Sequence, residues 1–292
     1  MTPVSATGIA SLKRRVLNLF CAFGAAALLL VPSLVSAQVV LSPALQNFGA
    51  LAASTVTNTG PSAVTGDVGV APLNAIVGFP PGTLTGTLRP GTAPAVVAQG
   101  DLTAAFVAAT ATVCNVDLSG IDLGGLILTP NTYCFATSAG LTGNLTLNFL
   151  GNPNAAFLFK TGSTLTTAAG SSVLAVNTGG AGCLPNVNFQ IGSSATLGTN
   201  SNFAGNILAQ ASVTLTTGAN LRGRALARTA AVTLDSNLAV GGCPNAAAFP
   251  GGPLGGAGVI PAPTLQEWAL IFLGLMLAGV GGWHVRRKII FR

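Results

Sequence analysis

The sequence predicts a mainly β protein: a β-solenoid of short strands with one long α-helix packed alongside it. Three observations lead to this prediction. A short motif recurs along the chain, its residues are mostly β-branched, small or glycine, and only 6% of the 292 residues are charged although 50% are hydrophobic. An ordinary soluble protein is about one quarter charged. The composition therefore indicates a β-rich domain whose surface carries hydroxyl and amide groups instead of ions.

The repeat is clearest between residues 195 and 240. Ala195-Thr196-Leu197 recurs as Val213-Thr214-Leu215 and as Val232-Thr233-Leu234, so the Thr-Leu pair returns after 18 and then 19 residues. Two earlier copies, at Thr146-Leu147 and Thr164-Leu165, are 18 residues apart. A unit this short must stack on its neighbours to bury a core. Because strand side chains alternate, we expect leucines inside and threonines outside, with the three later copies as the last coils of the solenoid.

One segment of the exported domain differs in kind. Between residues 94 and 113, apolar side chains that include Ala98, Leu102, Phe106 and Ala109 recur at helical spacing after a proline. This pattern predicts a helix whose apolar side packs against the solenoid.

Both ends of the chain resemble targeting segments. Residues 1–37 combine a basic cluster, an apolar run and a small-residue cleavage site, which predicts a secretory signal, with an uncleaved membrane anchor as the alternative. The exported domain would span 38–250 and end in a Gly/Pro-rich linker, 251–263. Residues 264–292 contain an apolar stretch and a basic end, which predicts a transmembrane helix. Because these ends carry the excess positive charge, the net charge of +6 does not indicate nucleic-acid binding.

The exported domain contains four cysteines. They are Cys114, Cys134, Cys183 and Cys243. An even number in an exported protein indicates disulfides. Of the three possible pairings, Cys114–Cys134 with Cys183–Cys243 is the simplest in sequence order. A metal site is the alternative, but there is no CxxC and the single histidine lies in the tail.

The sequence offers little for catalysis. Residues 38–250 contain no histidine and no glutamate, which excludes a Ser-His-Asp catalytic triad there. Asp117 and Asp122 are a conceivable acid pair, but they flank a Ser-Gly turn and more simply cap it. A polysaccharide lyase uses acids with arginines, and the comparable group in this chain is Arg222, Arg224, Arg228 and Asp235. The simpler explanation is that these four are outward surface residues paired across neighbouring coils. We therefore expect a protein that is not an enzyme and that holds neither a metal nor a cofactor.

Stacking the repeats predicts a column of threonines on one face. Its expected members are Thr146, Thr164, Thr196, Thr214 and Thr233, with Thr166 and Thr216 in a neighbouring column. A threonine hydroxyl donates and accepts hydrogen bonds, its methyl group is apolar, and its side chain is stiff. Such a surface suits an extended, uncharged lattice such as crystalline water, or a polysaccharide. The alternative is that threonine simply suits β-strands.

The domain resembles the microbial ice-binding protein family, whose members share an irregular β-solenoid with one long helix beside it. The resemblance covers about residues 44–240 and rests on segments in the same order, which include Ser54–Pro61, Thr65–Val70, Gly78–Gly82, Gly124–Leu126, Gly151–Ala155, Phe157–Phe159, Gly192–Gly198, Gly205–Ala209 and Gly223–Ala227. It implies that the solenoid is irregular and right-handed and that it carries a flat ice-binding face.

In that family the face often carries a Thr-Ala/Gly-x-Thr/Asn motif. Thr217-Gly218-Ala219-Asn220 fits the motif, whereas Thr199-Asn200-Ser201-Asn202 and Thr167-Ala168-Ala169-Gly170 fit it in part. The resemblance thus adds Thr167, Thr199, Asn202, Thr217 and Asn220 to the candidate ice-binding residues.

The tail resembles the IPTL-type C-terminal sorting signal of Gram-negative bacteria. The matching residues are Pro263, Thr264, Leu265, Glu267 and Trp268, followed by the apolar run and the basic end. The resemblance implies export, a sorting or processing protease as a partner, and transient or permanent contact with the inner membrane.

The leading hypothesis is an exported ice-binding protein at the cell surface or outside the cell, with an ice crystal surface as its partner. A structural or adhesive surface protein with the same fold is the first alternative. A polysaccharide-binding or polysaccharide-active solenoid is the second.

Overall fold

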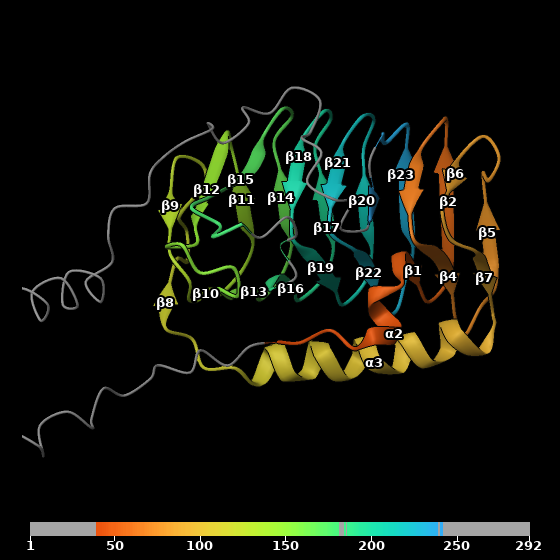
Figure 1. Cartoon of the computed structure of the whole chain (residues 1–292), viewed down its shortest axis with the longest axis horizontal. Helices are drawn as coiled ribbons and strands as arrows, with labels where there is room; N and C mark the ends of the chain where they lie inside the picture. The colour runs from red at the N-terminus through yellow and green to blue at the C-terminus, as the bar shows by residue number, and fades with distance from the viewer. Residues whose placement is uncertain (1–38, 181–183, 185, 239, 242–292) are drawn as a thin grey trace, which may run out of the picture. The chain divides into compact units, whose positions relative to one another are not determined.

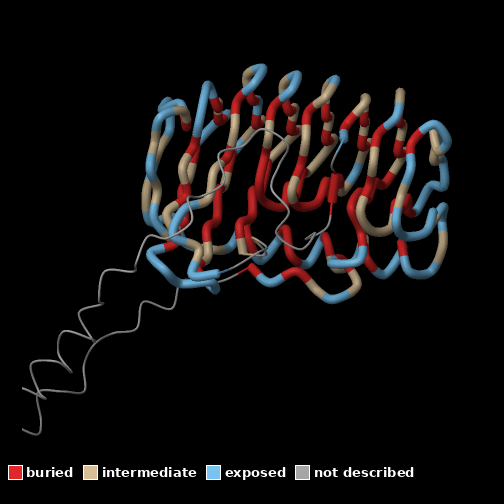
Figure 2. The backbone as a smooth tube through the Cα atoms, turned by 45° about the horizontal axis from the view of Figure 1, so that its top comes forward, coloured by how far each residue is buried: buried red, intermediate tan, exposed pale blue. Residues whose placement is uncertain are grey.

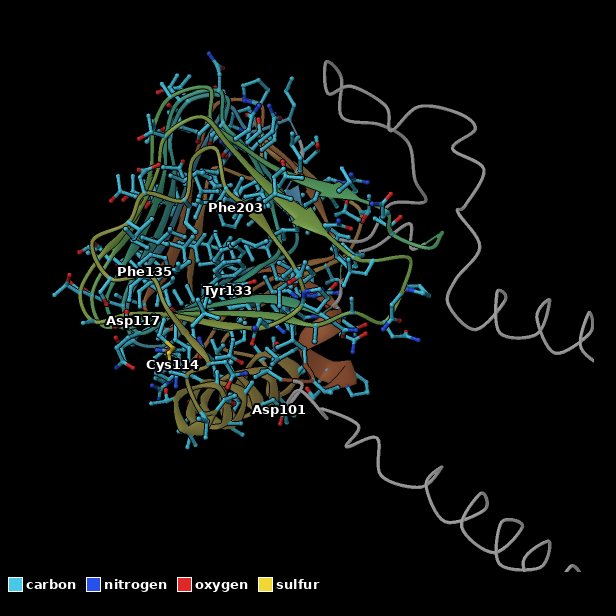
Figure 3. All side chains as sticks on the ribbon, turned by 90° about the vertical axis from the view of Figure 1, so that its left-hand side faces the viewer. Asp101, Cys114, Asp117, Tyr133, Phe135 and Phe203 are labelled. Atoms are coloured by element: carbon cyan, nitrogen blue, oxygen red, sulfur yellow. A yellow bond between two sulfur atoms is a disulfide. The ribbon has the colours of Figure 1, made fainter. Side chains whose placement is uncertain are left out.

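The computed structural model describes residues 39–180, 184, 186–238 and 240–241 as a solenoid of short parallel strands (Figure 1). Each coil contributes strands to three sheets, which we name A, B and C. Seen along the solenoid, the coils are roughly triangular, and Tyr133, Phe135 and Phe203 lie inside them (Figure 3). The predicted β-rich class and the stacking of coils are confirmed.

Each sheet runs the length of the solenoid, and its strands follow one another in space in this order. Sheet A contains β7 (Leu88–Pro90), β4 (Asp67–Val70), β1 (Phe48–Ala52), β22 (Ala225–Ala227), β19 (Asn206–Ala209), β16 (Val187–Ile191), β13 (Phe157–Thr161), β10 (Thr132–Phe135) and β8 (Val116–Asp117). Sheet B contains β11 (Ala139–Leu141), β14 (Leu165–Thr167), β17 (Ala195–Leu197), β20 (Val213–Leu215), β23 (Val232–Asp235), β2 (Thr55–Thr59) and β5 (Ala75–Val77). Sheet C contains β6 (Thr83–Leu84), β3 (Ala63–Thr65), β24 (Val240–Gly241), β21 (Asn220–Arg222), β18 (Asn202–Ala204), β15 (Ser172–Val176), β12 (Asn144–Asn148) and β9 (Ile127–Leu128).

The coils do not follow one another in space as they do in the sequence. The chain builds two coils from β1 to β6 and adds β7, and helix α3 (Ala93–Ala111) then carries it to the opposite end, where β8 begins (Figure 1). The later coils return until β22, β23 and β24 pair with β1, β2 and β3. The three copies between residues 195 and 240 are therefore interior coils, and the expectation that they end the solenoid is wrong. The strands of the final coil pair with the free strand edges of the N-terminal coils and so complete their backbone hydrogen bonds.

Helix α3 packs on the outer side of sheet A. Its buried residues recur every three or four positions: Ala95, Ala98, Leu102, Ala105, Phe106 and Ala109. They form an apolar cluster with leucines that face outward from sheet A, among them Leu51, Leu208 and Leu226. The Lys160 ammonium donates to the carbonyl oxygens of Thr110 at 2.8 Å and Thr112 at 2.5 Å. A cation at this position interacts favourably with the negative, C-terminal end of the helix dipole.

Two stacks of similar side chains fill much of the solenoid interior. The inward leucines Leu197, Leu215 and Leu234 are fully buried, as the alternation predicts. Leu165 is also fully buried, but it pairs with Ala195 and not with Leu197. Tyr133, Phe159, Phe189 and Phe203 form a second stack, with successive ring centroids 5.3, 4.4 and 4.7 Å apart. Figure 2 shows buried residues throughout the middle coils and exposed residues at turns and at both ends of the solenoid.

A buried polar ladder on sheet A secures the N-terminal segment. Asn206 donates to Asn188 at 3.1 Å, and Asn188 donates to the carbonyl oxygen of Val39 at 3.0 Å. The Arg224 guanidinium donates to Asn206 at 3.0 Å and to the carbonyl oxygen of Gln46 at 2.8 Å. Burial lowers the pKa of Arg224. The short helix α2 (Pro43–Gln46) is thereby fixed to the solenoid.

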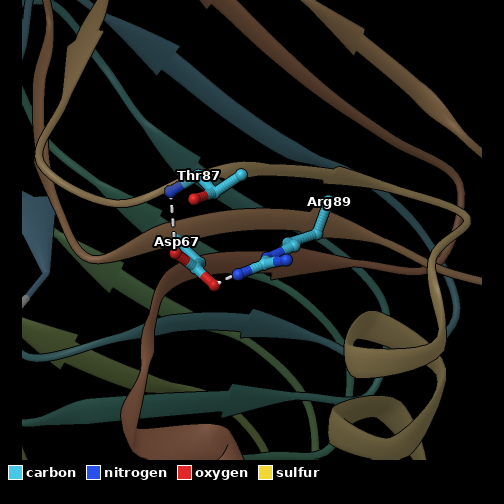
Figure 4. A network of polar contacts seen from close by, with 3 residues as sticks. All are labelled: Asp67, Thr87 and Arg89. Carbon is cyan, nitrogen blue, oxygen red and sulfur yellow. Dashed lines mark hydrogen bonds and ion pairs between the residues drawn. The ribbon is translucent and has the colours of Figure 1, made fainter.

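An ion pair joins the strands at the β7 end of sheet A. Arg89 Nε donates to Asp67 at 2.9 Å, and the backbone N–H of Thr87 donates to the other carboxylate oxygen at 2.7 Å (Figure 4). Strands β4 and β7 are short, so their pairing forms few backbone hydrogen bonds. The side-chain contacts add to this pairing and tie the terminal coil to the one before it.

The disulfide Cys114–Cys134 joins the chain just after α3 to strand β10, with 5.9 Å between the two Cα atoms. This half of the expected pairing is confirmed. Cys183 and Cys243 lie outside the described residues. So do the signal, the linker and the tail, that is residues 1–37 and 251–292. Within the described part of the chain, no helix is both long enough and apolar enough to cross a membrane.

We expect Leu215→Ala to lower the free energy of unfolding by about 3 kcal/mol, because it leaves a cavity within the inward leucine stack. Thr214→Ala is the matched control: it removes a side chain from the outer side of the same strand and should change stability by about 0.5 kcal/mol or less. Urea unfolding followed by circular dichroism measures both. Equal losses in the two variants would contradict this description of the core.

We expect Arg224→Met to cost roughly 3 kcal/mol of stability, because the buried Asn206 side-chain oxygen loses its charged donor. Residues 39–46 should also become more susceptible to proteolysis. Arg222→Met is the control, since Arg222 faces outward from sheet C and is more exposed. If proteolysis at residues 39–46 were the same in both variants, the ladder would not secure this segment.

Candidate functional site

The outer surface of sheet B carries threonines from five coils in register. The pairings align Thr166 with Thr196, Thr196 with Thr214, and Thr214 with Thr233. Strand β2 continues the series, because Thr57 pairs with Thr233. We call these five residues the threonine column. Paired strands lie about 4.8 Å apart, so the column presents a regular row of side chains.

The hydroxyl groups of this column are available to a ligand. Thr196, Thr214 and Thr233 are half-buried between fully buried neighbours, which directs them outward, and Thr166 is exposed. Among the residues that the structure describes, the hydroxyls of these four make no hydrogen bond within 3.5 Å. The Thr57 hydroxyl has one contact, at 3.5 Å from the Thr55 hydroxyl.

Two members of the expected column lie elsewhere. Thr146 is on β12 in sheet C, where it pairs with Ile127 and Leu174. Thr164 precedes β14, and its hydroxyl bonds to Ser138 at 2.9 Å. Thr166 occupies the position expected for Thr164, because Leu165 pairs with Ala195.

This correction has a physical cause. The coil from Leu165 to Ala195 is 30 residues long, whereas the next coil, from Ala195 to Val213, is 18. An irregular coil length breaks the sequence period, so the Thr-Leu pairs cannot be aligned by counting. The same alternation also recurs in sheets B and C, so a Thr-Leu pair does not by itself identify the sheet.

Most other candidates lie at the corner between sheets B and C and bond to the protein. Thr216 donates to the Leu197 carbonyl oxygen at 2.7 Å, and Thr199 lies 3.4 Å from the Thr216 hydroxyl. Thr217 donates to the Asp235 carboxylate at 2.5 Å. On sheet C, Asn220 donates to Asn202 at 3.2 Å. The corner hydroxyls and amides are therefore partly engaged.

Thr167 does not belong to the surface. Its side chain is 3% exposed, and its hydroxyl oxygen accepts a hydrogen bond from the backbone N–H of Gly198 at 2.9 Å. Its expected place among the ice-binding residues is wrong, because Thr167 follows Thr166 on the same strand and points inward.

Thr57 is a member of the column that the repeat does not predict. Its strand alternates clearly in the sequence, but it lies far from the other copies along the chain. Only the return of the chain through α3 brings β2 beside β23.

The conceivable acid pair has structural roles. Asp117 accepts hydrogen bonds from the hydroxyl and the backbone N–H of Ser119, and these lower the pKa of Asp117. Burial alone would raise the pKa of Asp122, but hydrogen bonds from Thr142 and Gly124 outweigh it and lower that pKa. Each carboxylate therefore stays ionised and holds a turn.

The arginine group is not assembled into one site. Arg222 lies on sheet C, Asp235 lies on sheet B, and Arg224 is buried beneath the N-terminal segment. Arg228 lies 4.5 Å from the centroid of the Phe106 ring, so it helps to hold α3. Among the described residues, no group of three His, Cys, Asp or Glu side chains could hold a metal ion.

Comparison with known proteins gives consistent matches. The profile of the ice-binding-like family matches residues 50–240, and that of the IPTL-CTERM motif matches residues 261–287. An ice-binding protein from Nostoc sp. (strain HG1) is 51% identical over 209 residues, which are 71% of this chain and 76% of that protein.

Solved structures agree with these matches. The crystal structure of an ice-binding protein from an Antarctic biological consortium has a TM-score of 0.65 and 43% identity, and covers 69% of this chain and 90% of that one. That of an ice-binding protein from the Antarctic ascomycete Antarctomyces psychrotrophicus has a TM-score of 0.64 and 39% identity, and covers 68% and 95%. This chain, with its helix-flanked solenoid and its IPTL-CTERM tail, therefore belongs to the ice-binding-like family.

Proposed function

We propose that the exported domain, residues 38–250, binds ice through the outer surface of sheet B and does not act as an enzyme. The observation that carries this proposal is the threonine column, in which four hydroxyls have no hydrogen-bond partner among the described residues. The ice-binding names of the relatives support the same function.

The physical basis is a match between two regular arrays. Ice is an extended, uncharged lattice, so its recognition requires many weak contacts at fixed spacing. Paired parallel strands fix the spacing along the column. Threonine is stiff at χ1, so its hydroxyl and methyl groups lose little conformational entropy when ice is bound. The stacked leucines beneath the column hold its backbone in place.

Charge is nearly absent from this surface. The column itself has no ionisable member, and a charged group would favour liquid water, which can reorient around it. Asp235 lies beside the column, paired with Thr59. Its two carboxylate oxygens accept hydrogen bonds from Thr217 and Ser236, and these replace part of the hydration of the carboxylate.

The tail sets the destination of the domain. The IPTL-CTERM match supports export, a processing protease and delivery to the cell surface or beyond. We propose that residues 1–37 direct export and are removed, and that residues 264–292 anchor the protein in the inner membrane until any processing. The linker 251–263 would separate the anchor from the domain.

We expect Thr214→Tyr to raise the protein concentration needed to inhibit ice recrystallisation by roughly tenfold, because a bulky ring at the middle of the column prevents the flat surface from meeting the lattice. Thermal unfolding should be nearly unchanged, since Thr214 points outward.

Thr217→Tyr at the corner is the matched variant and should have a smaller effect on ice-recrystallisation inhibition than Thr214→Tyr. A larger effect at Thr217 than at Thr214 would move the contact surface to the corner between sheets B and C. Purified protein that neither inhibits recrystallisation nor shapes ice crystals would exclude ice binding and favour a structural or adhesive role.

A further inference from the structure

The threonine column continues onto a strand that contains no exposed threonine. Strand β5 lies at the edge of sheet B and pairs with β2 in regular parallel register. In this pairing Val77 is aligned with Thr57, and Ala75 with Thr55. Val77 is therefore the next residue of the column after Thr57.

Val77 has the shape of a threonine without its hydroxyl. Both side chains branch at Cβ, and valine places a methyl group where threonine has its oxygen. The Val77 side chain is 58% exposed, and Ala75 is also exposed. A single exposed valine is ordinary on a protein surface. Its alignment with five threonines is what distinguishes Val77.

Strand β5 is fixed against the rest of the sheet. Ile76, between the two outward residues, packs against the solenoid core. The buried Asn58 side chain donates to the carbonyl oxygens of Gly60 and Gly78, each at 2.8 Å. Gly78 has a φ of +88°, and a Cβ there would lie 1.9 Å from the Asn58 carbonyl oxygen. The chain can therefore turn directly after Val77 while remaining close to β2.

We propose that Val77 is an ice-contacting residue, and that at this end of the face contact depends on the shape of the branched side chain and not on a hydroxyl. This inference rests on the proposed function. It extends the contact surface by one coil. The added residue is a valine, so a search for threonine motifs would not find it. An apolar side chain also suits this position because ordered water can close around a methyl group without a competing hydrogen bond.

The test compares substitutions in the full-length protein by recrystallisation inhibition and thermal hysteresis. Val77→Tyr should raise the effective concentration roughly tenfold by a steric clash with the lattice. Val77→Thr keeps the branched shape at an exposed position and should remain within about twofold of the unsubstituted protein.

Val107→Tyr is the matched control, because Val107 is also 58% exposed but lies on α3, which packs on sheet A. It should leave activity unchanged. Thermal unfolding of each variant separates loss of contact from loss of fold.

The outcomes distinguish this inference from the proposed function. If Thr214→Tyr lowers activity but Val77→Tyr does not, or if Val77→Tyr and Val107→Tyr lower it equally, then β5 is not part of the contact surface although the protein binds ice. If the unsubstituted protein has no activity, both the proposed function and this inference fail. Loss of activity in a folded Val77→Tyr, with activity kept in Val77→Thr, supports the inference.

Discussion

Parallel pairing between successive coils is the constraint on which this structure depends. In sheet B the pairing carries each residue onto its counterpart one coil away, as Leu197 onto Leu215 and Thr196 onto Thr214. The same backbone hydrogen bonds therefore build an inner leucine stack and an outer row of threonines. In sheet A they place Phe159 against Phe189 and Asn188 against Asn206. Core and surface are two sides of one repeated pairing.

The discontinuous path of the chain has a clear consequence for this pairing. A solenoid that began at one end and stopped at the other would place all repeats in sequence order. In this protein the N-terminal coils pair with the final coil, so α3 must span the solenoid to reach the opposite end. The helix in turn covers leucines that face outward from sheet A, such as Leu208 and Leu226. The connection is thus also part of the hydrophobic core, and the buried Arg224 secures the N-terminal segment that precedes β1.

Polar groups are divided between two roles. Some polar side chains bond within the fold: the Thr167 hydroxyl accepts from a backbone N–H, the Asp122 carboxylate holds a turn, and the Asn58 amide holds the chain after β5. The outward hydroxyls of sheet B are left open instead. Because bonded side chains cannot easily exchange partners with a ligand, the open row is the surface best suited to meet an external lattice.

The sequence alone determined the class of fold, the inward leucines, the helix and one disulfide pairing. These follow from local alternation, helical spacing and cysteine order, which are properties of short segments. It also identified Thr196, Thr214 and Thr233 as neighbours, because the coils that join them have nearly equal lengths.

Tertiary structure decided the rest. The irregular coil after β14 placed Thr166 rather than Thr164 in the row, and the sheet assignment removed Thr146. The return of the chain through α3 brought Thr57 beside Thr233, although Thr57 lies more than a hundred residues earlier, and Val77 follows Thr57 on the next strand. Register between distant strands depends on where the chain returns, and no local pattern in the sequence records that path.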